Sequence, residues 1–302
     1  MENISIEETN RALKRKNNKE KAGKIFAKIF IYFILLLMYS PLIYITVYSF
    51  TPTITTGVWG GFSFSNYTTL FDLANNKYAQ DIWSAAKNTV LVAITAASIS
   101  TILGTLGAIG IYYTRKKWIK SSLDFITQIP VVNAEIVTAV SLCVLFVLTA
   151  KFFPRSFFTL VIGHVVLSIP YVVMSVKPKL EQMDPSLYEA ALDLGATQTQ
   201  ALWKVIIPDI IPGILSGFLL SITLSLDDYV ITAFTKPTTG GFETISTYVD
   251  GVTKRQGLPT QLRAFTAILF AVILIIMIAM NIKSGRDAKK YNYKLKEKNK
   301  NA

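Results

Sequence analysis

Six stretches of the chain are apolar over a length that can cross a bilayer, which takes about 20 helical residues at roughly 1.5 Å rise each. The first has an apolar core too long for the hydrophobic region of a signal peptide, and no small-residue cleavage pattern follows it, so we interpret it as a helix that is retained. The six stretches are 29–50, 89–113, 123–150, 157–176, 210–234 and 264–282. This pattern predicts an all-α, polytopic membrane protein with six transmembrane helices.

The stretches differ in the size of their side chains. The second is rich in Gly, Ala, Ser and Thr and includes Gly104 and Gly107, small residues that let helices approach closely. The sixth consists mostly of Ile, Leu, Met, Ala and Val. We therefore expect the second helix inside the bundle and the sixth in contact with lipid.

Positive charge is concentrated at the two ends of the chain, whose formal net charge is +12. Residues 1–28 carry eight Lys and Arg against four acids, and residues 283–302 carry eight against two. Because short cytoplasmic segments accumulate Lys and Arg, both termini are expected in the cytoplasm, where the tails can touch anionic lipid. The same pattern explains the basicity without a nucleic-acid partner. The chain divides into a basic N-terminal tail (1–28), a membrane domain (29–282) and a basic C-terminal tail (283–302).

Composition narrows the chemistry further. Only 17% of the residues are charged, against about 25% in soluble domains. The single cysteine, Cys143, and the single histidine, His164, provide neither a disulfide framework nor a Cys/His metal cluster. We interpret Cys143 as a small core residue and His164 as a hydrogen-bonded interior residue rather than a proton relay.

The loop between the fourth and fifth stretches has the signals of two short helices. Asp184 suits an N-cap, Pro185 the first helical position and Gly195 the position just past the end, so residues 185–194 are expected to form a helix. Thr197 and Gln200 have the spacing of a capping box, and Pro208 is expected to end the second helix. Two short helices joined at a glycine would form a compact knob on the cytoplasmic face.

Three acids lie well inside the apolar stretches, away from their ends, where a carboxylate costs several kcal/mol unless it is paired or faces water. Glu135 lies near the middle of the third stretch, after Pro130 and Asn133, which are expected to interrupt or kink that helix. Asp227 and Asp228 lie in the outer half of the fifth, and no Lys or Arg falls inside any stretch. These acids favour a passage for a cation; the alternative is that a protonated or hydroxyl-bound carboxyl merely joins helices.

The loop also contains a motif of Glu189, Ala190 and Ala191, then Gly195 after three residues and Pro208 at the end of Val-Ile-Ile-Pro. This motif resembles the EAA loop of the membrane subunits of bacterial ABC importers. The resemblance implies a coupling loop over 184–208 that docks on a cytoplasmic ATPase, with Glu189 as its acidic contact. The chain has no G-x-x-x-x-G-K-[ST] phosphate loop, so no cofactor is expected on it, and ATP and Mg²⁺ would bind the ATPase partner.

Four further segments are informative: 61–71, 135–142, 164–173 and 221–230. They are similar to the PotC-type permeases of bacterial spermidine/putrescine importers. Glu stands at position 135 where Asp is more usual, and the similarity over 235–263 is only loose. The resemblance implies the type I ABC importer permease fold in the bacterial cytoplasmic membrane and no catalysis by this chain. It also implies a second homologous permease, two ATPase subunits, an extracytoplasmic polyamine-binding protein and a small cationic substrate. The substrate pathway would include Glu135, Asp227, Asp228 and, through cation–π contact, Tyr229.

Other functions stay open at this point. Importer permeases for iron(III), thiamine or phosphonate share the loop and the topology. An ion-coupled secondary transporter could use buried acids but would not need the loop, and the inverted repeats expected of it are not found. An intramembrane aspartyl protease needs its two acids on separate helices, whereas Asp227 and Asp228 are adjacent and expected on one helix, about 100° apart.

Overall fold

The computed structural model describes residues 2–55, 57–275, 277–279 and 282, and the predicted basic tail 283–302 lies outside them. Within the described part of the chain the regular structure is helical, without strands. The chain forms two compact units, which are considered one at a time. The first comprises Met1–Ala79 and Leu258–Ala302, and the second comprises Gln80–Gly257.

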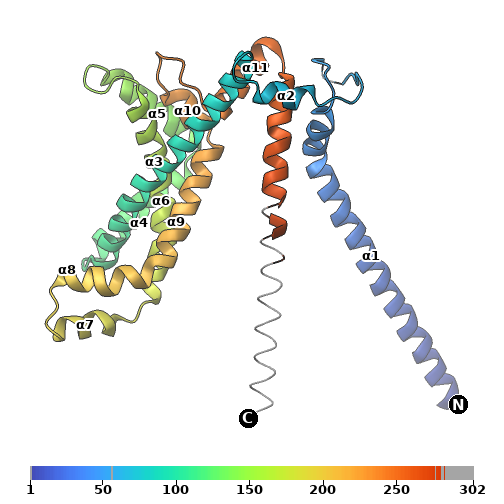
Figure 1. The fold of residues 1–302 in the computed structure, drawn as a ribbon. Helices are drawn as coiled ribbons and strands as arrows, with labels where there is room; N and C mark the ends of the chain where they lie inside the picture. The colour runs from blue at the N-terminus through green and yellow to red at the C-terminus, as the bar shows by residue number, and fades with distance from the viewer. Residues whose placement is uncertain (1, 56, 276, 280–281, 283–302) are drawn as a thin grey trace. The chain divides into compact units, whose positions relative to one another are not determined.

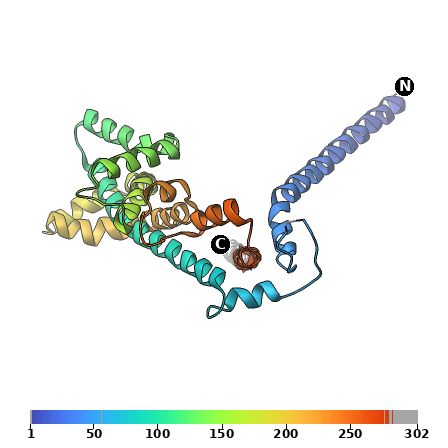
Figure 2. The ribbon, with the colours of Figure 1, turned by 90° about the horizontal axis from the view of Figure 1, so that it is seen from above.

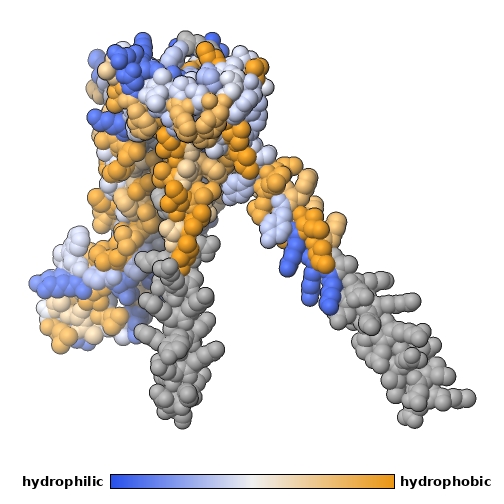
Figure 3. Space-filling view, turned by 45° about the vertical axis from the view of Figure 1, so that its right-hand side comes forward, coloured by the Kyte–Doolittle hydropathy of each residue, from blue (hydrophilic) through white to orange (hydrophobic). Residues whose placement is uncertain are grey.

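The first unit contains α1 (Glu2–Tyr48), α2 (Ser65–Phe71) and the helix Thr260–Ala279 (Figure 1). The apolar side chains of α1 are exposed over its membrane-length part, and Figure 3 shows this apolar surface in orange. Arg263, at the start of the last helix, is 1% exposed and donates to the carbonyl oxygens of Thr53, at 3.0 Å, and Ile54. A buried guanidinium thereby ties the loop after α1 to the last helix, satisfying carbonyls that would otherwise lack partners.

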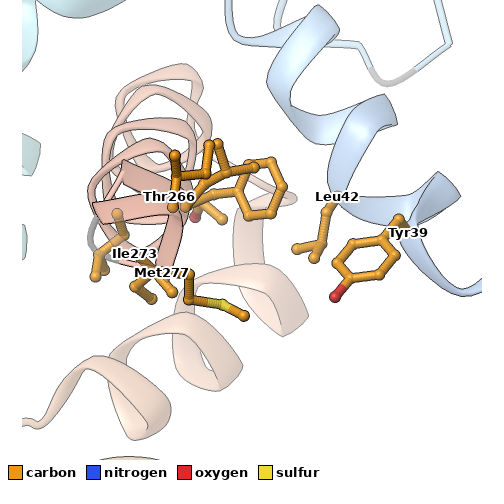
Figure 4. A pocket seen from close by; sticks show the side chains of 9 residues that line it. Tyr39, Leu42, Thr266, Ile273 and Met277 are labelled. Atoms are coloured by element: carbon orange, nitrogen blue, oxygen red, sulfur yellow. The ribbon is translucent and has the colours of Figure 1, made fainter. Parts of the chain in front are cut away.

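An apolar groove of about 610 Å³ lies between α1 and the last helix of this unit (Figure 4). Tyr39 and Leu42 of α1 form one side, and residues including Thr266, Ile273 and Met277 form the other. Nearly all of the lining is hydrocarbon, so this groove suits a lipid chain or another apolar helix and offers nothing to hold a charged solute.

The second unit holds the remaining helices, with α6 at its centre. Its elements are α3 (Lys77–Tyr113, from residue 80 onward), α4 (Lys117–Val132), α5 (Glu135–Leu148), α6 (Phe157–Gln182), α7 (Pro185–Asp193), α8 (Gln198–Ala201), a π-helical turn (Leu202–Ile206), α9 (Ile207–Asp227), α10 (Val230–Thr235) and α11 (Ile245–Gln256). α6 packs along α9 and also contacts α4, α5 and α10. α7 and α8 lie at one end of the unit, and α10 and α11 at the other (Figure 1).

Close packing around α6 depends on glycine. A β-carbon on Gly104 of α3 would stand 2.7 Å from Cβ of Val172, and one on Gly217 of α9 would stand 3.2 Å from its Cα. Val172 is completely buried between them. The expected role of Gly104 is confirmed, whereas Gly107 has room for a methyl group, because its β-carbon would lie 3.9 Å from Val173 Cγ2.

The predicted third span is not one helix. Five helices are long and apolar enough to cross a membrane, and α4 and α5 form a sixth candidate only as a pair bent by 101°. The break follows Pro130, which lacks a backbone N–H and cannot continue the hydrogen-bond ladder. The expected interruption by Pro130 and Asn133 is therefore confirmed, and the predicted third span consists of two helices; both can be followed in green in Figure 2.

The predicted fifth span differs at both ends. Pro208 does not end the preceding helix: α8, the π-helical turn and α9 run on as one 30-residue span, Gln198–Asp227. In the π turn the Ile207 N–H reaches the carbonyl of Leu202, and this shift of register allows the proline to enter the first turn of α9. At the other end the helix stops at Asp227, so the expected helix over 210–234 is wrong as well, and the two aspartates do not share one helix.

Gly104→Ala is expected to destabilise the protein, because the added methyl group would force α3 and α6 apart at Val172, and overpacking a core costs about 1–3 kcal/mol. Gly107→Ala is the matched control, since its methyl group makes an ordinary contact and alanine favours the helix. Thermal unfolding of the detergent-solubilised protein should give a lower Tm for Gly104→Ala only. Equal Tm values for the two variants would contradict this account of the packing.

Candidate functional site

The break between α4 and α5 places Glu135 at the start of a helix. Asn133 and Ala134 are extended, with ψ of 144° and 130°, and α5 begins directly afterwards. A carboxylate in the first turn of a helix is favoured by the unpaired N–H groups and the dipole at that end. The expected position near the middle of the third stretch, just after an interruption, is therefore refined to the first residue of a new helix.

The break between α9 and α10 forms around Asp228. This residue is extended, with ψ of 127°, and α10 begins two residues later. Its carboxylate accepts hydrogen bonds from the backbone N–H groups of Ile231, at 3.0 Å, and Thr232, at 2.8 Å. An aspartate side chain that satisfies the first amides of a helix acts as its N-terminal cap.

The two breaks meet at a polar cavity of about 210 Å³ within the second unit. Three predicted site residues, Glu135, Asp227 and Asp228, line it together. Asn133, Thr223 and Tyr171 contribute further polar groups, and Pro130, Val131, Leu167 and Leu224 complete the lining. The sequence interpretation missed Thr223, although it lies four residues before Asp227 and therefore on the same face of α9.

The cavity is lined by acidic side chains and by no basic ones. None of the residues that line it is a lysine or an arginine. Glu135 and Asp227 are exposed on the isolated chain, while the side chain of Asp228 is buried. A concave surface that carries carboxylates and lacks cations attracts a positively charged solute and focuses its field on the bound charge.

A buried network connects Asp228 to α6. His164 is 1% exposed, and its Nε2 lies 3.0 Å from Thr232 Oγ1 and 3.5 Å from Asp228 Oδ2. Its Nδ1 lies 2.8 Å from Ser225 Oγ. The interpretation of His164 as a hydrogen-bonded interior residue is confirmed.

Tyr229 does not join the cavity. Its hydroxyl donates to Asp250 of α11 at 2.8 Å, and Asp250 also pairs with Lys254 at 2.8 Å. The hydrogen bonds from Lys254 and Tyr229 hold the pKa of Asp250 below its usual value. The structure thus places Tyr229 on an exposed polar cluster, apart from the three acids.

The cap residues predicted in the loop after α6 are confirmed. Asp184 caps α7 by accepting the backbone N–H of Ser186 at 3.0 Å, and this bond lowers the pKa of the Asp184 carboxyl. Gly195 has φ of +86°, a conformation that other residues rarely adopt. The Thr197–Gln200 capping box is formed, with the Thr197 N–H donating to Gln200 Oε1 at 3.0 Å.

Glu189 and Ala190 lie on the exposed side of α7, while Ala191 is half-buried. Leu187 and Leu194 are also exposed, at 49% and 89%, so the outer side of α7 combines a charge with apolar area. On the inner side Tyr188 packs against the core formed by α3, α6, the π-helical turn and α9, and its ring lies 5.6 Å from that of Tyr113. The knob is therefore anchored on one side and free for a partner on the other.

The chain matches a known protein family and is similar to curated relatives over most of its length. Residues 100–284 match the family described as "Binding-protein-dependent transport system inner membrane component". The spermidine/putrescine transport system permease protein PotC of Haemophilus influenzae is 31% identical over 249 residues, which cover 82% of this chain and 92% of the relative. The putrescine transport system permease protein PotI of Escherichia coli K12 is 31% identical over 201 residues, covering 65% and 69%.

Solved structures agree on the fold. A bacterial ABC transporter involved in the import of the acidic polysaccharide alginate superposes with a TM-score of 0.61 at 17% identity, covering 88% of this chain and 97% of that one. An amino acid ABC transporter superposes with a TM-score of 0.50 at 20% identity, covering 68% and 92%. With a matched region longer than half the chain and relatives of 31% identity over most of its length, this protein belongs to the inner membrane components of binding-protein-dependent transport systems.

Proposed function

We propose that the chain is a transmembrane permease subunit of an ATP-driven ABC importer for polyamines such as spermidine and putrescine. The observation that carries the substrate class is the convergence of Glu135, Asp227 and Asp228 on one cavity without Lys or Arg. The names of the PotC and PotI relatives support the same class of solute.

The chemistry of the cavity suits an amine better than the other solutes considered. Glu135 and Asp227 are accessible, and each can pair with one ammonium group of a flexible, multiply charged chain. A phosphonate would meet only like charge there. No three His, Cys, Asp or Glu side chains among the described residues are grouped to hold a metal ion, so a bound iron(III) gains no support.

Energy would come from partners. Two ATPase subunits on the cytoplasmic side would bind ATP, and the loop 184–208 would dock on one of them through Glu189, Ala190 and Ala191. Gly195 would keep the knob compact and Pro208 would mark its junction with α9. A second, homologous permease and an extracytoplasmic polyamine-binding protein would complete the assembly in the bacterial cytoplasmic membrane.

The knob and the cavity are separated in a way that fits a permease whose knob faces the ATPase. Within the second unit the α7–α8 knob lies at the end opposite α10 and α11 (Figure 1). If the knob and the basic tails face the cytoplasm, the acids lie toward the outer half of the passage, where a cation delivered from outside arrives first. Residues 29–282 would then be the permease domain, and the tails 1–28 and 283–302 would contact anionic lipid.

Glu135→Gln combined with Asp227→Asn should raise the KM for spermidine uptake about 25-fold, if each lost charge pair is worth roughly 1 kcal/mol. Uptake is measured with the complete assembly in proteoliposomes. Asp250→Asn is the matched control, because Asp250 is an acid of the same unit that does not line the cavity. An unchanged KM in the double variant would contradict the cation passage.

We propose that Glu189 pairs with a basic residue of the ATPase. Glu189→Lys should therefore abolish substrate-stimulated ATP hydrolysis or detach the ATPase, because it places two positive charges together. Asp193→Lys is the control: it makes the same charge change on α7, at its C-terminal end, where a cation is favourable for the helix dipole. Hydrolysis by the purified assembly decides between them. Normal coupling in Glu189→Lys would contradict the assignment of α7 as the helix that docks on the ATPase.

The chain alone in liposomes should accumulate no polyamine, with or without an ion gradient, because the proposed mechanism needs ATP hydrolysis by a partner. Radiolabelled spermidine uptake is the measurement, and the complete assembly with internal ATP is the positive control. Gradient-driven accumulation by the single chain would instead favour an ion-coupled secondary transporter.

A further inference from the structure

The three acids of the cavity are not equivalent. Glu135 and Asp227 are exposed, whereas the side chain of Asp228 has no accessible surface although its residue borders the cavity. An acid that is buried needs hydrogen bonds to offset its lost hydration. The contacts of Asp228 therefore indicate what its carboxylate does.

Both carboxylate oxygens of Asp228 are already occupied by this chain. Oδ1 accepts the N–H of Ile231 at 3.0 Å. Oδ2 accepts the N–H of Thr232 at 2.8 Å and its hydroxyl at 2.7 Å. These are donors in the first turn of α10, and in a membrane such groups have no water to replace a lost partner.

The hydroxyl of Thr232 sets the direction of the remaining bonds. It has one hydrogen, and that hydrogen goes to Asp228 Oδ2. Thr232 Oγ1 must then accept from His164 Nε2, which lies 3.0 Å away and therefore carries a proton. In the neutral ring Nδ1 accepts from the hydroxyl of Ser225 at 2.8 Å. The bonds run in one direction, from Ser225 of α9 through His164 of α6 to Asp228.

The other side of Asp228 is held by the outer segment. Its carbonyl oxygen accepts the Ser246 hydroxyl of α11 at 2.8 Å. α11 is tied in turn to α3, because the N–H of Ile245 donates to Thr89 Oγ1 at 2.9 Å. The break between α9 and α10 thus contacts α6 and α11 directly and is connected to α3 through α11.

We infer that Asp228 is a positioning residue, held by His164 and Thr232, whose carboxylate caps α10 and keeps the α9–α10 break in place, while Asp227 and Glu135 contact the substrate amines. This assignment rests on the proposed function for the identity of the substrate. What Asp228 contributes is the geometry of its oxygens at α10, and what Asp227 contributes is an accessible charge.

The first test separates KM from Vmax in the complete assembly. Asp227→Asn should raise the KM for spermidine about fivefold with an unchanged Tm, since it removes one exposed charge pair. Asp228→Asn keeps one oxygen for the α10 amides; it should lower Tm and Vmax and leave KM unchanged, and Asp228→Ala should lower Tm further. A rise in KM for Asp228→Asn equal to that for Asp227→Asn, at an unchanged Tm, would overturn the assignment.

Thr232→Val keeps the test decisive if Asp228→Asn does not assemble. Valine has the shape of threonine without the hydroxyl, so Tm and Vmax should fall at an unchanged KM, and Thr232→Ser should restore both. A raised KM with normal Tm in Thr232→Val would contradict the positioning role.

The second test asks whether His164 acts through Asp228. In a double-mutant cycle on Tm, His164→Leu and Asp228→Asn should be strongly non-additive, whereas His164→Leu and Asp227→Asn should be additive. His164→Gln, which retains a donor, should recover part of the loss. Additive effects on Tm in both cycles would show that His164 does not act through Asp228. These Tm measurements need no substrate, so they decide the capping role even if the wild-type assembly takes up no spermidine, the result that would refute the proposed function itself.

Discussion

A helix that stops within a membrane leaves backbone N–H and C=O groups without water, and the second unit depends on how this constraint is met at its two breaks. At the α4–α5 break a proline removes one donor and the chain turns by 101°. At the α9–α10 break the Asp228 carboxylate takes the first amides of α10. Because both breaks are stabilised locally, irregular backbone and polar side chains can border a cavity at a depth where continuous helices would present only their apolar sides.

α6 links this cavity to the α7–α8 knob. Toward one end it carries His164, which contacts Thr232 and Ser225 beside the acids. Its other end supplies Leu180 to the core on which Tyr188 of α7 packs, and Met183, directly after the helix, joins the same core. Between them Val172 packs against Gly104 of α3 and Gly217 of α9. Neither α3 nor α9 can therefore move far without displacing α6. Close-packed side chains are hard to compress, so a displacement of one helix is passed on to the helices it contacts. The same helix that anchors the knob therefore also holds the network around Asp228.

The sequence predicted the fold where local rules dominate. The apolar lengths located the long helices, and the cap residues Asp184, Gly195 and Thr197 located the knob, because capping is decided by neighbours a few residues away. The sequence did not predict correctly which prolines end a helix. Pro130 and Pro208 carry the same local signal, yet one accompanies a break and the other enters a continuous helix, because a π turn precedes Pro208 and shifts the hydrogen-bond register.

By itself, the sequence determined the membrane class, the Glu-Ala-Ala loop motif and the identity of the acids, since each is a matter of composition or of short spacing. Only the tertiary structure decided which side chains share the cavity. It brought Glu135 from α5 beside Asp227 and Asp228, sent Tyr229 to Asp250 instead, and buried one of two adjacent aspartates. Neighbours in a chain end in different surroundings when a helix ends between them, and that ending depends on Thr232 and His164, which only the folded chain places against Asp228.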